Sequence, residues 1–188
     1  MSNDHVVRVY NIKKDKEVLK DKGGADMIIH SAWSQKVDDL RFATVSPKEI
    51  KFWHPADATK RLSVKGTFGS KHKMTNFSCV AFDNEGYAYT GGANGSIHIW
   101  DGTNTIERAI KGHTAEVTAI SCVPGKVISG SKDQKICVFS SNNGEYKQEK
   151  IIDFGGAYPK SIDFLNGKIL VGLHNGSIFE IEEKTDKR

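Results

Sequence analysis

The chain has 188 residues, a formal net charge of +4 and a sequence pI near 8.8, with 38% hydrophobic and 27% charged residues. This composition predicts a folded, soluble body and excludes a disordered chain, because enough apolar surface is available to offset chain entropy. No apolar run approaches the ~20 residues that cross a bilayer, and the first ten residues do not resemble a signal peptide. Three cysteines without paired spacing also suit a reducing compartment, so a cytoplasmic location is expected.

A β-branched and aromatic strand pattern recurs along the chain. It begins at Val6–Tyr10 and returns at Glu49–Trp53, Ser96–Trp100, Lys135–Phe139 and Ser177–Ile181. The anchor residues Val7, Ile50, Ile97, Ile136 and Ile178 follow one another at intervals of 43, 47, 39 and 42 residues. A period of roughly 40 to 45 residues with four strands per unit is typical of a propeller blade.

Each anchor strand sits inside a set of strands joined by short turns. Two strands precede it, as at Val117–Cys122 and Val127–Ser131, and a more polar strand follows it, as at Tyr146–Ile152. Asn94-Gly95 and Asn175-Gly176 predict two-residue hairpins, since both residue types tolerate positive φ. No segment shows sustained helical periodicity.

We therefore predict an all-β protein, a partial β-propeller built from four-stranded antiparallel blades. Blade pieces of one propeller are expected at about 6–20, 26–66, 77–111, 116–152 and 160–182. Both ends of the chain supply the third strand of a blade, so they do not complete each other. The chain is expected to be a fragment of a larger propeller, or to self-associate through its open blade edges.

Several motifs resemble the WD-repeat family: Gly112-His113, Ser129-Gly130, Asp133 and Trp100-Asp101. The resemblance implies a hydrogen-bonded brace inside each blade, made by a His, a Ser or Thr, an Asp and a Trp. Matched by position, one unit offers His113, Ser129 and Asp133 with Phe139 in place of Trp. The preceding unit offers Thr90 and Trp100, with Asn94 in place of Asp and His72 or Lys73 near the His position; the last unit has Val171 in place of the hydroxyl residue. No brace is complete, so blade packing and loop chemistry are expected to hold the fold.

Three longer stretches are similar to the echinoderm microtubule-associated protein-like family: Phe42–Trp53, Asn76–Phe82 and Lys111–Val117. The similarity extends from about residue 26 to residue 181. It implies a cytoskeletal protein that binds tubulin or microtubules through tandem propellers. The alternative is a general WD-repeat scaffold subunit of another protein complex, with no microtubule role.

No catalytic, cofactor or metal site is expected. Gly91–Gly95 lacks the Lys-Ser/Thr pair of a phosphate-binding loop, and the histidines fall in different blades or on different strand faces. Cys79 lies in an alternating apolar strand, which is typical of a core residue. Trp53, Trp100 and Phe139 recur at the repeat period, which favours blade core over a base-stacking platform. The predicted class is a protein-binding, non-enzymatic scaffold without nucleic-acid or membrane partners.

Sorting the loops by the propeller rule predicts two faces of opposite charge. The first face carries the candidate partner-binding residues Lys48, Lys71, His72, Lys73, Lys111, Lys132 and Lys160, against Asp26, Glu116 and Asp133. The opposite face carries Asp38, Asp39, Asp57, Asp83, Glu85, Asp101 and Glu145, partly offset by Lys13, Lys14 and Lys36. The basic face would steer an acidic segment such as a tubulin tail. The alternative is that these lysines are ordinary solvated loop residues.

Overall fold

The computed structural model describes residues 5–55, 62–69, 73–102, 104–142 and 144–183. Within these residues the chain forms antiparallel β-sheets and one short 3₁₀ helix, Ile12–Lys14. The first sheet is a two-stranded ribbon of β1 (Val6–Asn11) and β2 (Lys16–Lys22). The second contains β3 (His30–Trp33), β4 (Phe42–Ser46), β5 (Glu49–Trp53) and β6 (Ser63–Lys65).

Two further four-stranded sheets and a three-stranded sheet follow in chain order. The third sheet contains β7 (Phe77–Phe82), β8 (Ala88–Gly92), β9 (Ser96–Trp100) and β10 (Ile106–Lys111). The fourth contains β11 (Val117–Val123), β12 (Lys126–Ser131), β13 (Lys135–Asn142) and β14 (Glu145–Asp153). The last contains β15 (Pro159–Leu165), β16 (Lys168–Leu173) and β17 (Ile178–Glu182).

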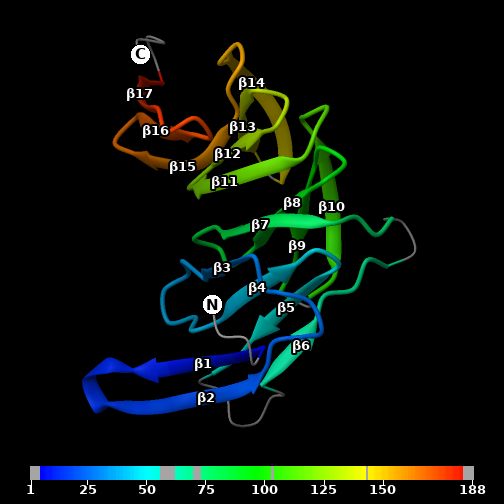
Figure 1. Ribbon diagram of the computed structural model, residues 1–188, viewed down its shortest axis with the longest axis vertical. Helices are drawn as coiled ribbons and strands as arrows, with labels where there is room; N and C mark the ends of the chain where they lie inside the picture. Colours follow the sequence, from blue (N-terminus) through cyan, green and yellow to red (C-terminus); the bar gives the residue numbers. More distant parts are fainter. Residues whose placement is uncertain (1–4, 56–61, 70–72, 103, 143, 184–188) are drawn as a thin grey trace.

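Each sheet pairs its strands in chain order, and successive sheets lie one after another along the molecule. Figure 1 shows the array running from the β1–β2 ribbon at one end to β15–β17 at the other. The prediction of an all-β, partial β-propeller of four-stranded antiparallel blades is confirmed.

The hydrophobic core lies between successive sheets. Leu19 of the ribbon packs with Phe42 and Trp53 of the second sheet. Three larger clusters then join each remaining sheet to the next. The middle sheets therefore bury both of their faces, which explains why their central strands are buried at nearly every position.

The anchor isoleucines occupy equivalent positions in the strand register. Each lies opposite a small or β-branched residue of the preceding strand: Ile50 opposite Val45, Ile97 opposite Gly91, Ile136 opposite Gly130 and Ile178 opposite Gly172. The first three are at most 1% exposed, whereas Ile178 is 72% exposed. Register is therefore repeated at the last sheet, where the described residues leave this isoleucine exposed.

The prediction of two-residue loops at Asn94-Gly95 and Asn175-Gly176 is wrong, because each hairpin has a three-residue loop that begins one residue earlier. The Gly95 N–H donates to the Gly92 carbonyl at 3.1 Å, so Ala93 and Asn94 form the centre of the turn. Gly95 follows the turn with φ of +81°, and Gly176 repeats this arrangement with φ of +88°. A type I turn followed by one left-handed residue gives a three-residue hairpin loop, in which only the glycine needs positive φ.

Candidate functional site

His113, Ser129 and Asp133 lie together in the fourth blade and form a hydrogen-bonded chain. His113 Nε2 lies 2.8 Å from Ser129 Oγ in β12, and His113 Nδ1 lies 3.0 Å from Asp133 Oδ2 in the β12–β13 turn. The Asp133 carboxylate also accepts the backbone N–H groups of Thr114 at 3.0 Å and Lys135 at 3.1 Å. These side chains therefore connect the segment that precedes β11 to the turn between β12 and β13.

Burial and hydrogen bonding fix the charge state of this chain. Burial lowers the pKa of His113 and outweighs the neighbouring Asp133 carboxylate, which raises it. Burial alone would raise the pKa of Asp133, but the Thr114 N–H and the imidazole lower it overall. A neutral imidazole beside an ionised carboxylate carries its proton on Nδ1, so Nε2 accepts the hydrogen bond from the Ser129 hydroxyl.

The order Ser129–His113–Asp133 matches the hydrogen-bond order of a Ser-His-Asp catalytic triad. The Ser129 side chain lies in the middle of β12 and has 0% exposure, and His113 has 2%. A nucleophile must reach the carbonyl that it attacks. The buried position of this chain therefore suits a role in holding the blade rather than in chemistry.

Two other sheets contain a Trp–Thr hydrogen bond at the corresponding place. Trp100 Nε1 donates to Thr90 Oγ1 at 2.9 Å, and Trp53 Nε1 donates to Thr44 Oγ1 at 2.9 Å. The second pair was missed by sequence reasoning, although Thr44 and Trp53 both lie in the quoted Phe42–Trp53 stretch. The spacing from Thr to Trp is one residue shorter there than in the third sheet. A search for a Thr at about this distance before a Trp could have identified the pair.

Backbone hydrogen bonds join several of the predicted lysine-bearing loops to the segments beside them. The Phe77 N–H donates to the Pro47 carbonyl, the His113 N–H to the Gly95 carbonyl, and the Lys132 N–H to the Glu116 carbonyl. Each bond joins a turn between the second and third strands of a sheet to the segment entering a first strand. The described lysines in or next to these loops are all exposed, and we call them the lysine face: Lys48, Lys73 and Lys132, with Lys111 at the end of β10 and Lys160 at the start of β15. Lys71 and His72 lie outside the described residues.

The members of the lysine face differ in how far their charge is compensated. The Lys132 ammonium lies 2.5 Å from the Glu116 carboxylate, which raises the pKa of Lys132. Asp133 is also an acidic residue of these loops, but it belongs to the brace and its side chain is only 8% exposed. The positive charge available to a partner is therefore carried mainly by Lys48, Lys73, Lys111 and Lys160.

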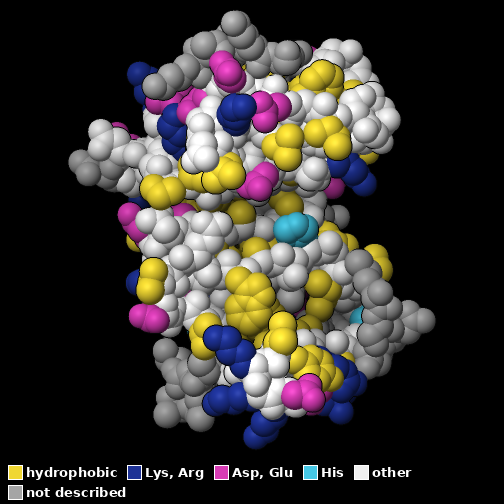
Figure 2. All heavy atoms as spheres, turned by 90° about the vertical axis from the view of Figure 1, so that its left-hand side faces the viewer, with side chains coloured by type: hydrophobic (Ala, Val, Ile, Leu, Met, Phe, Trp, Pro, Cys, Tyr) yellow, Lys and Arg dark blue, Asp and Glu magenta, His cyan; other side chains and the backbone are white. Residues whose placement is uncertain are grey.

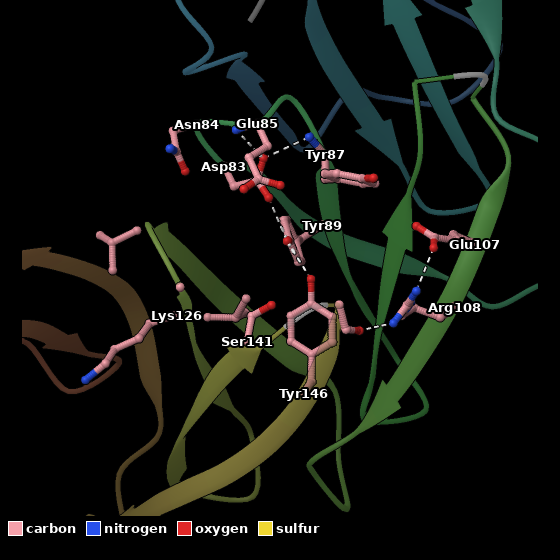
Figure 3. A pocket seen from close by; sticks show the side chains of 14 residues that line it. Asp83, Asn84, Glu85, Tyr87, Tyr89, Glu107, Arg108, Lys126, Ser141 and Tyr146 are labelled. Atoms are coloured by element: carbon pink, nitrogen blue, oxygen red, sulfur yellow. Dashed lines mark hydrogen bonds and ion pairs between the residues drawn. The ribbon is translucent and has the colours of Figure 1, made fainter.

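The opposite face contains a pocket of about 480 Å³ between the third and fourth sheets. Figure 3 shows Tyr89 and Tyr146 pointing toward each other across it, with Asp83 beyond Tyr89. Tyr89 Oη lies 2.9 Å from Tyr146 Oη and donates to Asp83 Oδ2 at 2.8 Å. Burial, the bond to Tyr146 and the Asp83 charge raise the pKa of Tyr89, so this phenol stays protonated.

The acidic residues of this opposite face mostly serve their own loops. Asp83 Oδ1 accepts the backbone N–H groups of Glu85 and Tyr87, and Asp101 Oδ1 accepts that of Thr105. Arg41 lowers the pKa of Asp39 to about 2, although burial alone would raise it. The face is acidic in sequence, but its carboxylates stabilise turns. Asp57 lies outside the described residues.

The described residues offer little to other kinds of chemistry. Burial raises the pKa of the Cys79 thiol to about 12 and that of Cys137 to about 12, which leaves both protonated at neutral pH. No group of three His, Cys, Asp or Glu side chains in the described ranges is placed to hold a metal ion. Across the same residues, no helix combines the length and apolar character that crossing a membrane requires.

Comparisons with known proteins agree with this architecture. A family model described as the IP5P C-F beta-propeller matches residues 8–146. The chain is 43% identical over 187 residues to the ciliary WD repeat-containing protein ctxp80 of Euplotoides octocarinatus, covering 99% of this chain and 25% of that protein. It is 27% identical over 183 residues to human echinoderm microtubule-associated protein-like 1, covering 95% of this chain and 22% of that protein.

A solved structure supports the same fold. The WD40 beta propeller domain of Doa1 superposes with a TM-score of 0.73 at 22% identity, covering 97% of this chain and 59% of that one. The chain spans about a quarter of the length of the curated relatives, 25% and 22% in the two cases above. The expected resemblance to WD-repeat and echinoderm microtubule-associated protein-like proteins is confirmed. The chain belongs to the WD-repeat β-propellers, in the family described as the IP5P C-F beta-propeller.

Proposed function

We propose that this chain is part of one WD-repeat propeller in a non-enzymatic, protein-binding scaffold of the cytoplasmic cytoskeleton, and that it binds tubulin or microtubules. The feature that supports the proposal is the lysine face, a set of exposed lysines in or beside the loops of four sheets that we infer to present their charge on one side. The names of the ciliary and microtubule-associated relatives give the expected partner.

The physical basis is electrostatic attraction by loops on a rigid frame. The braces and the cores between sheets hold the loops in place, so the lysine face presents its charge without first ordering a chain. Lysine ammonium groups attract an acidic, extended segment from a distance, and this attraction weakens as salt rises. No cofactor or metal takes part in the proposed binding.

Co-sedimentation with microtubules across a salt series tests the proposal. Charge reversal by Lys48→Glu, Lys73→Glu and Lys111→Glu together should weaken binding at low salt by about tenfold or more and flatten its salt dependence. The matched control is Lys13→Glu, Lys14→Glu and Lys36→Glu, which makes the same change in net charge at exposed positions away from the lysine face. This control should bind like the parent chain.

The alternative function, a scaffold subunit with no microtubule role, gives a different result. The chain would then remain in the supernatant at low salt. Equal loss of binding by the two triple variants would mean that net charge, and not the lysine face, governs binding.

A further inference from the structure

The pocket between the third and fourth sheets has walls that involve neither end of the array. Its lining extends from Asp83 to Tyr146, and each of the two sheets has four strands and a further sheet on its other side. Its volume of about 480 Å³ falls within the range of ligand pockets. Pockets for small molecules are lined mainly by apolar side chains, whereas charged and hydroxyl groups dominate this lining. The lining therefore favours a charged or strongly polar ligand.

A chain of hydrogen bonds across the pocket determines which atoms it presents. Tyr89 Oη donates its one proton to Asp83 Oδ2 at 2.8 Å, so the 2.9 Å contact between the two phenols is donated by the Tyr146 hydroxyl. Both phenolic protons are thereby used. A lone pair remains on the Tyr146 oxygen and another on Asp83 Oδ2. The pocket therefore presents hydrogen-bond acceptors, and it suits a ligand that donates.

The two basic residues of the lining are already engaged. Arg108 forms an ion pair with Glu107 at 2.6 Å and donates to the Gly144 carbonyl. Lys126 forms an ion pair with Glu183, and Figure 3 shows its ammonium group pointing away from the tyrosine pair. An anionic ligand would have to compete with these carboxylates, so the arrangement disfavours one.

Two carboxylates of the lining have no such partner. Within the described part of the chain, neither Asp83 nor Glu85 forms an ion pair, although Asp83 is only 9% exposed. Figure 2 shows the opposite arrangement near the top of the view, where acidic and basic side chains lie beside one another. A carboxylate held away from bulk water attracts a cation more strongly than one in water, because the local dielectric constant is lower. The charge of the pocket therefore favours a cationic ligand.

The tyrosine rings narrow the choice of cation. Tyr87 and Tyr146 are half-buried and line the pocket. A cation over a tyrosine ring is attracted by the negative face of the ring. The guanidinium group of arginine is planar, stacks on such rings and offers five donors to several oxygens at once, whereas the ammonium group of lysine is compact and strongly hydrated. Rings together with separate acceptor oxygens therefore favour arginine.

We propose that the pocket between the third and fourth sheets binds the side chain of an arginine from a partner protein. The guanidinium group donates to the oxygens of Asp83 and Tyr146, and the exposed carboxylate of Glu85 attracts it into the pocket. This inference does not depend on the proposed binding of microtubules, because the lysine face comes from other loops and attracts an acidic segment. The two surfaces can therefore be occupied at the same time.

Titration of the purified chain with short capped peptides, followed by the NMR shifts of its backbone amides, tests the pocket. The peptide Gly-Arg-Gly should cause saturable shifts at Asp83, Tyr89 and Tyr146. Gly-Lys-Gly should bind more weakly, because its ammonium group cannot reach several oxygens at once. Gly-Gln-Gly, which has no charge, should cause no saturable shift at these residues.

Two variants test the proposed contacts. Tyr146→Phe should weaken binding of Gly-Arg-Gly about tenfold, because it removes an acceptor for a charged donor. Glu85→Gln should weaken it about threefold, as expected for an exposed charge. The Glu85 side chain is exposed and the turn uses only its backbone N–H, so this variant keeps the fold. Asp26→Asn is the matched control, since it makes the same charge change at an exposed position outside the pocket, and it should bind like the parent.

Three results would each overturn the proposal: equal shifts with Gly-Arg-Gly and Gly-Gln-Gly, binding of Gly-Lys-Gly as tight as that of Gly-Arg-Gly, or parent-like binding by both Tyr146→Phe and Glu85→Gln. Co-sedimentation with microtubules should be the same for these variants and the parent. Failure of the arginine pocket can therefore be distinguished from failure of the lysine face.

Discussion

The sheets β11–β14 and β15–β17 share a strand register but differ in what covers them. In the fourth sheet both faces meet a neighbouring sheet, and Ile128, Ile136 and Val138 are at most 1% exposed. In the last sheet one face packs inward through Ile169 and Ile181, while Ile178 is open to solvent. The difference teaches that the burial of a repeated position depends on the sheet packed beside it, and that the repeat pattern alone does not report this burial.

The largest expected effect comes from the equivalent isoleucines at 136 and 178. Ile136→Ala should lower the free energy of unfolding by about 4 kcal/mol, because it removes a fully buried side chain and leaves a cavity. Ile178→Ala should lower it by less than about 0.5 kcal/mol, since the side chain is 72% exposed. Urea denaturation at low protein concentration measures both. Similar losses for the two variants would contradict the comparison.

The glycines that follow the equivalent turns give a second contrast. A Cβ on Gly95 would lie 2.2 Å from the His113 carbonyl oxygen of the next blade, whereas a Cβ on Gly176 meets no described atom within 4 Å. Both positions need positive φ, so each Gly→Ala change carries a backbone cost of about 1 kcal/mol. Gly95→Ala should cost about 3 kcal/mol in total, because the overpacking is added.

Thermal unfolding of the two glycine variants checks this contrast. Gly176→Ala is the matched control, since it has the same backbone strain without the neighbour. A Gly95→Ala protein as stable as Gly176→Ala would show that the contact between the β8–β9 turn and the next blade is loose.

The Trp–Thr bond of the third sheet should contribute less than the core. Thr90→Val keeps the size of the side chain but leaves the Trp100 Nε1–H buried without its acceptor, which costs about 2 kcal/mol. Thr90→Ser retains the hydroxyl and should lose less. Urea denaturation followed by tryptophan fluorescence compares the two variants. Equal free energies of unfolding for Thr90→Val and Thr90→Ser would show that the Trp100–Thr90 hydrogen bond does not stabilise the fold.

The smallest expected effect is a pH dependence due to the His113 brace in the fourth sheet. The folded protein holds the pKa of His113 below its ordinary value of 6.5, because the side chain is buried. As the pH falls through 6.5, the unfolded chain binds the proton more readily than the folded one, so the free energy of unfolding decreases. Above this window the contribution is constant.

Chemical denaturation between pH 7.5 and pH 5.5 measures this dependence. His113→Gln should reduce the slope. Burial also lowers the pKa of His30, so His30→Gln is the comparison variant that leaves the brace intact. A slope that is unchanged in His113→Gln would mean that the brace histidine does not titrate in this window.

Much of the fold follows from local patterns in the sequence. The strands, their order and the repeat of the anchor residues follow from period-2 alternation and a spacing near 40 residues, because each blade has to bury apolar residues at the same positions. The length of the loop between Gly92 and Ser96 does not follow from the sequence, since an Asn-Gly pair fits both a two-residue hairpin loop and the end of a three-residue loop. The exposure of Ile178 was not predictable, because it depends on a neighbouring sheet and not on its own strand.

Some features of the candidate site could be predicted from the sequence, and others could not. The lysine-bearing loops could be assigned to one side because the propeller connection rule fixes where each loop opens. The ion pair of Lys132 with Glu116 and the contact between Tyr89 and Tyr146 depend on side-chain reach across loops and sheets. The tyrosines are 57 residues apart in the sequence and meet only through packing of two blades. No spacing rule within one repeat could find them.

The central claim is that contact between successive sheets holds this array together, and amide hydrogen exchange resolved by strand tests it most directly. At low protein concentration the amides of β12 and β13 should exchange about tenfold more slowly than those of β16 and β17, or slower still. Equal protection of the two sheets would contradict the claim.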